Sequence, residues 1–413
     1  MSLHGRVAVS LLTLGGTLAA SAAAQDPAGF RAEDHALGNL FGTREALSSV
    51  GITVDLDYTG EATLDLERDG GDYAHEVTGD LKVDLGHAVG WRGATVNLRI
   101  INRVGGDYAT SERGATQQGQ EIAGGAQPFR LLFLTLQQEF MDGAVDVLAG
   151  RTVMSGQFAT TPIACAFQTL AVCGQPIGLP LGGAWQTYPA QAWGGRVRAT
   201  LPGRFELMAG AYERNDAAFE ESGFALSTRG QSGTAYPIEL GYTVGGSLPG
   251  QVKIGYIYDT SDTQDVRPAG LAPWALTSRE QGYLVFDQMI LRTGEGAKGG
   301  VIVFGAATIA GEGQARVDRQ LMGGVVAQGL VPARPKDHLG LVVSRVSYAD
   351  GLTGPGDLAA VPLTQEVFGE ANYGVQATPW LKLIPNVQHV SRPGGVAARE
   401  NLWMMGLRID LSL

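Results

Sequence analysis

Short segments in which apolar and polar residues alternate recur along this chain up to its last residue. In the segment 77–85 every second residue is apolar or glycine, and the residues between them are threonine, aspartate and lysine. A period of two is that of a β-strand with one apolar face, so the chain is predicted to be all-β. The clearest segments of this kind are 52–58, 77–85, 94–100, 193–199, 204–211, 252–258, 366–373 and 407–413.

The polar face of these strands carries full charges in nearly every segment. A soluble β-sandwich alternates in the same way, with its apolar face in the core. A membrane barrel instead turns the apolar face to lipid and the charged face to a wet lumen. Three features favour the barrel: the strands continue without a second kind of element, tyrosine and tryptophan lie near strand ends as an interfacial belt does, and a strand that ends at Leu413 can pair with the first strand and leave no open edge.

Less regular segments complete the predicted wall, and they are 129–140, 144–151, 238–242, 283–290, 301–310, 319–330, 339–348 and 381–390. Together with the clear segments they give about sixteen strands, an even number as in bacterial barrels. Short turns, such as 201–204, 246–250 and 377–379, alternate with longer connections at 104–127, 155–191, 213–236 and 259–281. We therefore expect residues 51–413 to form a transmembrane antiparallel β-barrel.

The first 50 residues differ from the rest. Residues 1–24 have a weakly basic start, an apolar stretch at 7–20 and a small-x-small pattern that ends at Ala24, which predicts a secretory signal peptide. A retained anchor helix is the alternative, but the apolar stretch is shorter than a membrane span requires. Residues 25–50 are interpreted as an N-terminal periplasmic or plug segment, with a short helix at 41–50 that has Thr43 near its N-cap.

Composition excludes some classes of function. Charged residues are 17% of the chain, below the roughly 25% of soluble domains, and the net charge of -11 argues against a nucleic-acid partner. We identify no catalytic residues: a G-x-S-x-G or H-E-x-x-H motif does not occur. The glycines at 294, 296 and 299 fit a dinucleotide pattern without a surrounding βαβ unit, so they are interpreted as a turn. Neither a cofactor nor a metal is expected.

The two cysteines, Cys165 and Cys173, lie eight residues apart. A close pair in an exported protein predicts a disulfide that closes a small loop. A metal site is the rival interpretation, but no histidine lies near the pair.

Two sets of motifs are specific: one lies between Gly150 and Tyr212, and the other is Pro385-x-x-Gln388 followed by Arg392-Pro-Gly-Gly395. In these motifs the sequence resembles the OprB-type family of carbohydrate-selective porins. The resemblance covers nearly the whole chain after the signal peptide. It implies a sixteen-stranded barrel that lets sugars and other small neutral solutes diffuse across the bacterial outer membrane.

A sugar pore needs hydrogen-bond donors and acceptors in a wet constriction, and arginine offers five donors in a fixed plane. Strand parity and the motifs together select inward-facing candidates, with Arg130 the weakest because its segment has no clear face. The predicted pore-lining residues are Arg99, Arg130, Arg151, Arg196, Arg198, Glu239, Glu366, Glu370 and Gln388. The plainer interpretation is that such charges pair across strands and only keep the lumen wet.

The leading hypothesis is passive diffusion of mono- and small oligosaccharides through this lumen. The alternatives are a general or anion-biased porin, a soluble exported carbohydrate-binding β-protein, and a barrel enzyme, which would need a catalytic dyad that we do not find. The expected partners are carbohydrate solutes, outer-membrane lipid and lipopolysaccharide, and the barrel-assembly machinery. The protein is expected to be a monomer or a homotrimer.

Overall fold

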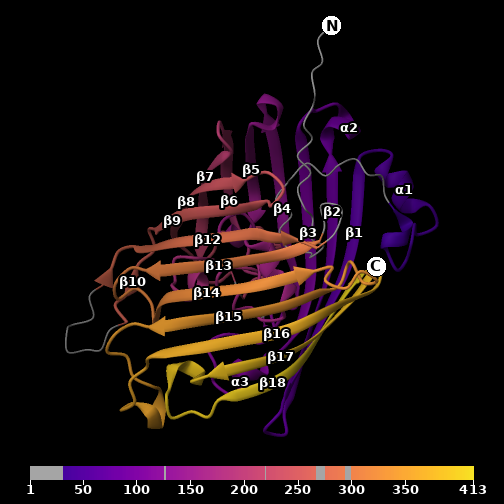
Figure 1. The fold of residues 1–413 in the computed structure, drawn as a ribbon. Coiled ribbons are helices and arrows are strands. Elements are labelled where there is room, and N and C mark those ends of the chain that lie inside the picture. The colour runs from indigo at the N-terminus through magenta and orange to yellow at the C-terminus, as the bar shows by residue number, and fades with distance from the viewer. Residues whose placement is uncertain (1–30, 125–126, 219, 267–274, 294–298) are drawn as a thin grey trace.

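Sixteen strands form one closed antiparallel barrel (Figure 1). The computed structural model describes residues 31–413 except 125–126, 219, 267–274 and 294–298. Its barrel strands are β1 (Ile52–Asp65), β2 (Gly71–Asp84), β3 (Ala94–Gly105), β4 (Phe129–Phe140), β5 (Val145–Thr152), β6 (Ala192–Leu201), β7 (Phe205–Asn215), β8 (Gln231–Val244), β9 (Gly250–Asp259), β12 (Arg279–Arg292), β13 (Gly300–Ala310), β14 (Val317–Gln328), β15 (His338–Tyr348), β16 (Gln365–Thr378), β17 (Leu381–Ser391) and β18 (Leu402–Ser412). The predicted signal peptide, residues 1–24, lies outside the described residues.

Each barrel strand pairs with its neighbours in chain order, and β1 pairs with β18 to close the wall. This last seam runs in register from Asp57 opposite Ser412 to Asp65 opposite Met404. The prediction of an antiparallel barrel of sixteen strands is therefore confirmed. A separate two-stranded sheet, β10 (Thr263–Gln264) and β11 (Ala275–Leu276), belongs to the connection between β9 and β12.

The helical elements are all short. They are α1 (Thr43–Ser48), α2 (Leu85–Val89), α3 (Tyr108–Ser111), α4 (Gly178–Leu181) and the 3-10 turns η1 (Ala32–Asp34), η2 (Met141–Gly143), η3 (Met154–Gly156), η4 (Pro162–Ala166), η5 (Gly356–Leu358) and η6 (Pro393–Gly395). Among the described residues, no helix has the length and apolar character needed to cross a membrane.

The alternation of the sequence divides the two faces of the wall. Residues assigned to the apolar face, such as Leu240, Ile254 and Trp403, are exposed on the outside. Their polar neighbours, such as Glu239, are buried in the interior. A register slip of one residue would turn every charge toward lipid, so the period of two specifies the register strongly.

Strand β4 lacks a clean alternation because it contains a bulge. Arg99 of β3 pairs with Phe133, whereas the next residue, Ile100, pairs with Leu131, so Leu132 is an extra residue in the ladder. A bulge changes which face the following side chains take. This explains why the segment 129–140 appeared apolar on both faces.

The connections at the two ends of the barrel differ in length, as predicted. We call the end that carries 106–128, 153–191, 216–230 and 260–278 the long-loop end, and the opposite end the short-turn end. The connection expected at 213–236 is shorter than predicted, because β7 continues to Asn215 and β8 begins at Gln231.

The interior of the barrel is filled in large part by connections from the long-loop end. The segment 153–191 places Phe158, Phe167 and Trp185 in one buried apolar cluster, together with wall residues such as Tyr212 and Phe304. The predicted disulfide between Cys165 and Cys173 is present in this segment. The inward-folded connections therefore narrow the interior of the barrel.

Residues 31–50 pack against the last residues of the chain, beside the C-terminus in Figure 1. The backbone N–H of Ala36 donates to the carbonyl of Ser412 at 2.8 Å, and the buried Arg44 guanidinium donates to the carbonyl oxygen of Leu413 at 2.6 Å. Helix α1 begins at Thr43, two residues after the expected start at 41, and its N-cap is Gly42, so no side chain caps it.

Candidate functional site

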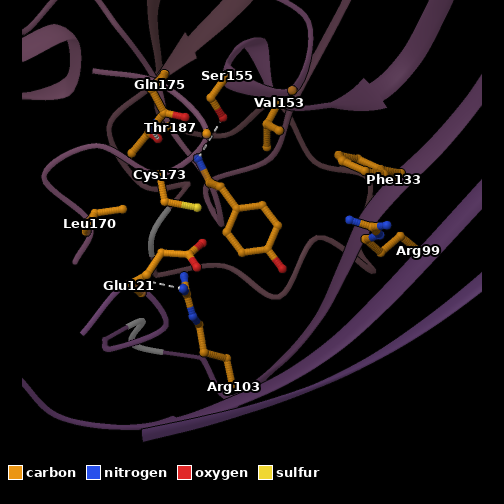
Figure 2. Close-up of a pocket in the computed structure, with 13 residues that line it drawn as sticks. Arg99, Arg103, Glu121, Phe133, Val153, Ser155, Leu170, Cys173, Gln175 and Thr187 are labelled. Carbon is orange, nitrogen blue, oxygen red and sulfur yellow. Dashed lines mark hydrogen bonds between the residues drawn. The ribbon is translucent and has the colours of Figure 1, made fainter. Parts of the chain in front are cut away.

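A pocket lined by charged and apolar side chains lies inside the barrel, between the wall at β3 and β4 and the inward-folded segments 106–128 and 153–191 (Figure 2). Its lining surrounds about 480 Å³ of space when the part that is open to solvent is counted. The side chains that shape it are Arg99, Arg103, Glu121, Phe133, Leu170, Gln175, Thr187 and Tyr188. We call this cavity the lumen pocket.

Each arginine of the lumen pocket is paired with a carboxylate of strand β2. The Arg99 Nε and Nη2 donate to the two oxygens of Asp80 at 2.7 and 2.8 Å, a bidentate pair. The Arg103 Nε lies 3.3 Å from the carboxylate of Glu76. The bidentate pair fixes the Arg99 guanidinium. The ion pair with Glu76 balances the charge of Arg103, whose Nη2 donates to the backbone carbonyl of Glu121 at 2.7 Å.

Aromatic rings lie beside the same two arginines. The Arg99 guanidinium carbon is 5.2 Å from the ring centre of Phe133, and that of Arg103 is 5.1 Å from the ring centre of Tyr188. The Tyr188 hydroxyl donates to Glu76 at 2.7 Å. Burial, together with the neighbouring Glu76 carboxylate, raises the pKa of this hydroxyl well above its ordinary value, so it remains a donor.

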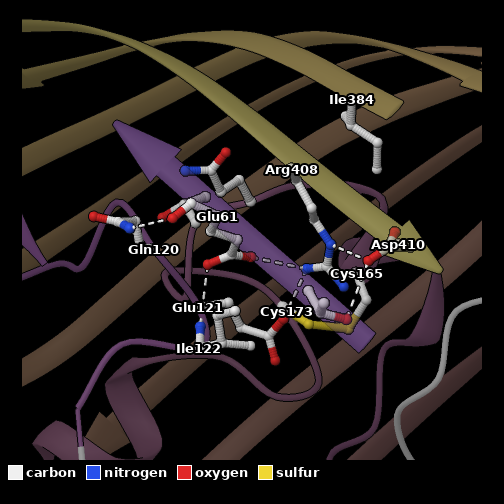
Figure 3. A network of polar contacts seen from close by, with 12 residues as sticks. Glu61, Gln120, Glu121, Ile122, Cys165, Cys173, Ile384, Arg408 and Asp410 are labelled. Atoms are coloured by element: carbon white, nitrogen blue, oxygen red, sulfur yellow. Dashed lines mark hydrogen bonds and ion pairs between the residues drawn. A yellow bond between two sulfur atoms is a disulfide. The ribbon is translucent and has the colours of Figure 1, made fainter. Parts of the chain in front are cut away.

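A second polar cluster joins the barrel seam to the segment 106–128 (Figure 3). Arg408 of β18 contacts Glu61 of β1 at 3.2 Å, Glu121 at 2.8 Å and Asp410 at 2.8 Å. Glu61 also accepts from the backbone N–H of Ile122 at 3.2 Å. Because Glu121 lines the lumen pocket as well, the seam and the pocket share one residue.

Four of the predicted pore-lining residues contact the backbone of the inward-folded segments. Glu366 accepts from the N–H groups of residues 116 and 117 at 2.7 and 2.8 Å. Glu370 accepts from those of residues 168 and 169 at 3.0 and 2.9 Å. Glu239 accepts from the N–H of Ala159 at 2.7 Å, and the Gln388 side-chain amide donates to the carbonyl of Gly119 at 2.8 Å. We call Glu239, Glu366, Glu370 and Gln388 the loop tethers.

Arg196 and Arg198 lie on β6 and share the carboxylate of Asp146. Arg196 forms a close ion pair with it and also donates to the Gln157 side chain at 2.9 Å. Arg198 lies 3.6 Å from Asp146 and 3.8 Å from Glu206. Of the nine predicted pore-lining residues, Arg99 is the one that lines the lumen pocket.

Arg130 holds the connection between β7 and β8. Its guanidinium donates to the carbonyls of Gln127 at 2.9 Å and of Ala218 and Glu221 at 3.0 Å. The side chain is fully buried. Its contacts are therefore those of a residue that positions the chain.

The prediction that Arg151 points into the lumen is wrong. Its register partners are Trp193 and Leu134, which are exposed on the outer wall, and paired residues share a face. Its guanidinium lies 5.7 Å from the Trp193 ring and 3.7 Å from Glu213. The carbonyl of Ser227 accepts from it at 3.2 Å, so the segment 216–230 covers it.

Sequence reasoning missed several residues of these clusters. Arg103 continues the parity of Arg99 on β3, and Arg408 alternates with outward residues on β18, so both carried a usable signal. Glu121 and Tyr188 lie in connections, where alternation gives no information. The described histidine, cysteine, aspartate and glutamate residues form no group of three placed to hold a metal ion.

Comparison with known proteins decides the family. The family model of the carbohydrate-selective porins, OprB family, matches residues 68–413. The chain belongs to this family. Porin B of Pseudomonas aeruginosa is 32% identical to it over 91% of this chain and 90% of that protein. The family resemblance seen in the sequence is thus confirmed.

Solved OprB structures have the same fold. The high-pH structure of OprB from Pseudomonas putida has a TM-score of 0.86 and 29% identity, and covers 91% of this chain and 97% of that one. The low-pH structure of the same protein has a TM-score of 0.62 at 22% identity. This OprB-family barrel is a protein of the bacterial outer membrane, and the hypothesis of a soluble binding protein is set aside. In such barrels the longer loops face outward from the cell.

Proposed function

We propose that this OprB-family porin passes mono- and small oligosaccharides by passive diffusion and that they cross at the lumen pocket. The observation that carries the proposal is the pair of arginines, each held by a carboxylate and each beside an aromatic ring. Fixed guanidinium donors suit hydroxyl groups, and the rings offer apolar faces to the C–H side of a sugar. Within this proposal Arg99, Arg103 and Tyr188 touch the solute.

Local charge balance supports a neutral solute over an anion. Asp80 and Glu76 lie within ion-pair distance of Arg99 and Arg103, so the lumen pocket presents donors without an unpaired positive charge. A pore that selects anions is expected to leave such charges unmatched along its path. The proposal therefore favours sugar passage over an anion-biased channel.

The loop tethers act at a distance from the solute in this proposal. Arg130, Arg196 and Arg198 likewise hold the wall and its connections, and none of these residues is proposed to bind sugar. The protein works as a channel without a catalytic step. We also propose that residues 1–24 are removed after export, that residues 25–50 lie on the periplasmic side, and that the barrel-assembly machinery inserts the protein as a monomer or a homotrimer.

Liposome swelling tests the proposed function. Purified protein is reconstituted, and swelling rates are measured for a panel of neutral sugars and for uncharged polyols of matched size. We expect sugars to enter faster than polyols of equal size, and the Arg103→Gln variant to lose that difference. Rates that follow solute size alone, or a reversal potential in a KCl gradient that indicates strong chloride preference, would show that the proposal is wrong.

A further inference from the structure

Two arginines interrupt the largely apolar outer wall on one side of the barrel. The strands β13 to β18 are described completely, and the arginines at outward positions on them are Arg319 of β14 and Arg345 of β15. Side chains at neighbouring outward positions are large and aliphatic, and Ile309 and Leu321 are 58% and 64% exposed. A guanidinium is unusual on a lipid-facing surface, so this pair is a candidate binding site.

The register places the two arginines next to each other. Arg319 pairs with Ser347, and Arg345 pairs with Leu321, so the arginines are diagonal neighbours on adjacent strands. Such positions are about 7–8 Å apart, within reach of two long side chains that converge on one group. Both lie close to the long-loop end, since β14 begins at Val317 and β15 ends at Tyr348.

The charges of this pair are incompletely matched. Arg319 has one ionic partner, Asp318, with 3.2 Å between Nε and Oδ1, and its side chain remains 55% exposed. Arg345 is exposed and has neither a hydrogen bond nor an ion pair within the described part of the chain. Two adjacent guanidinium groups repel each other, and an anion between them reverses the sign of that interaction.

We propose that Arg319 and Arg345 form a binding site for a phosphate group of lipopolysaccharide in the outer leaflet. Guanidinium groups bind phosphate through paired hydrogen bonds, and the long-loop end is the level at which lipid A phosphates lie. The acyl chains lie along the aliphatic side chains of the wall below, Leu321, Leu341 and Val343, which are exposed. We call this the outer-wall arginine site.

The apolar surroundings favour a lipid over a free phosphate ion. A free ion would gain nothing from Ile309 or Leu341, whereas a glycolipid buries its chains there. A second copy of this chain is the rival occupant, and the oligomeric state of the double variant distinguishes it from lipid. The arginines of the site therefore match the charge of an amphipathic anion, and the aliphatic side chains around them match its apolar part.

The test measures binding of lipid A to delipidated protein in a mild detergent, with three probes: bisphosphorylated lipid A, dephosphorylated lipid A and inorganic phosphate. The variant is Arg319→Gln with Arg345→Gln, and the matched control is Arg229→Gln, which removes an exposed arginine from the segment 216–230. We expect the double variant to bind bisphosphorylated lipid A about tenfold less tightly, with the control unchanged. Heat-modifiable migration verifies that every variant is folded.

Three outcomes would overturn the outer-wall arginine site. The first is equal affinity of the wild type and the double variant for bisphosphorylated lipid A. The second is equal binding of the phosphorylated and dephosphorylated lipids, or competition by inorganic phosphate at equal concentration. The third is a double variant that keeps lipid A binding but changes from a trimer to a monomer, which would make the pair a contact between copies. Sugar swelling is independent of this site and is expected to be unchanged.

Discussion

Neutralising one loop tether is expected to widen the pore without breaking the barrel. Glu370 accepts two consecutive backbone N–H groups of the segment 153–191, from Gln168 on one oxygen and from Thr169 on the other. The Glu370→Gln variant keeps the size of the side chain and one oxygen. Its NH₂ group then faces an N–H donor, so one of the two hydrogen bonds is lost.

The size of the effect follows from those two contacts. A hydrogen bond to a charged group contributes about 1.5–3 kcal/mol, and one between neutral groups about 1 kcal/mol. Losing one charged bond and weakening the other costs about 3 kcal/mol. That corresponds to a shift of about a hundredfold in the ratio of docked to undocked segment. Strand pairing in the wall contributes separately, so the barrel itself is expected to remain closed.

Single-channel recording in planar bilayers measures this change. The variant is expected to show larger and noisier conductance steps and to pass longer oligosaccharides in swelling assays. The matched control is Asp55→Asn, which removes one charge from an inward position opposite Asp80 and has no hydrogen bond to either inward-folded segment among the described contacts. It is expected to keep the conductance steps of the wild type.

Conductance that is unchanged in both Glu370→Gln and Glu366→Gln would refute this reasoning, since the two tethers hold different segments. Equal changes in Glu370→Gln and the Asp55→Asn control would also refute it, because the effect would then come from lumen charge alone. Heat-modifiable migration of each variant separates a widened pore from a misfolded barrel.

Other perturbations test separate parts of the structure. Tyr188→Phe removes the donor to Glu76, and we expect weaker block of ion current by glucose with nearly unchanged conductance, whereas equal block would exclude the hydroxyl from the solute path. Reduction of Cys165–Cys173 is expected to add two hydrogen masses and to lower the stability of the enclosed loop by about 2.5 kcal/mol. The current through the reduced protein is then expected to become noisy at a lower temperature than the current through the oxidised protein. Arg151→Gln is expected to leave sugar flux unchanged but to make the segment 216–230 more sensitive to protease. A change in sugar flux would indicate that Arg151 faces the lumen.

The wall of this barrel could be predicted because the face that each strand residue takes depends only on its position within its own strand. A period of two places Glu366 and Glu370 on the inner face, and both are buried there. Parity fails where a strand is irregular or where its outer face is covered. Asp146 and Arg151 lie on one strand at an odd separation, so they occupy opposite faces, and a hydrogen bond to Ser227 joins Arg151 to the segment that covers it.

The partners of the inward charges were not predictable in the same way. Glu370 contacts residues 168 and 169, which lie some 200 positions away in the sequence. The alternation of a strand does not predict such contacts. Charges that the sequence presents as solute contacts turn out to hold backbone. Tyr188 belongs to the lumen pocket only because an entire connection turns inward, which no single-strand pattern encodes.

The buried cluster that contains Phe158, Phe167 and Trp185 gives this porin two distinct structural layers. The wall is held by inter-strand hydrogen bonds, while the inner layer is held by apolar contact and by a few carboxylates, and the two need not fail together. On heating, the inner layer is expected to loosen first, so that current rises while the protein still migrates as a folded barrel. In a channel of this kind the wall is the more stable layer. The permeability is then set by the less stable inner layer.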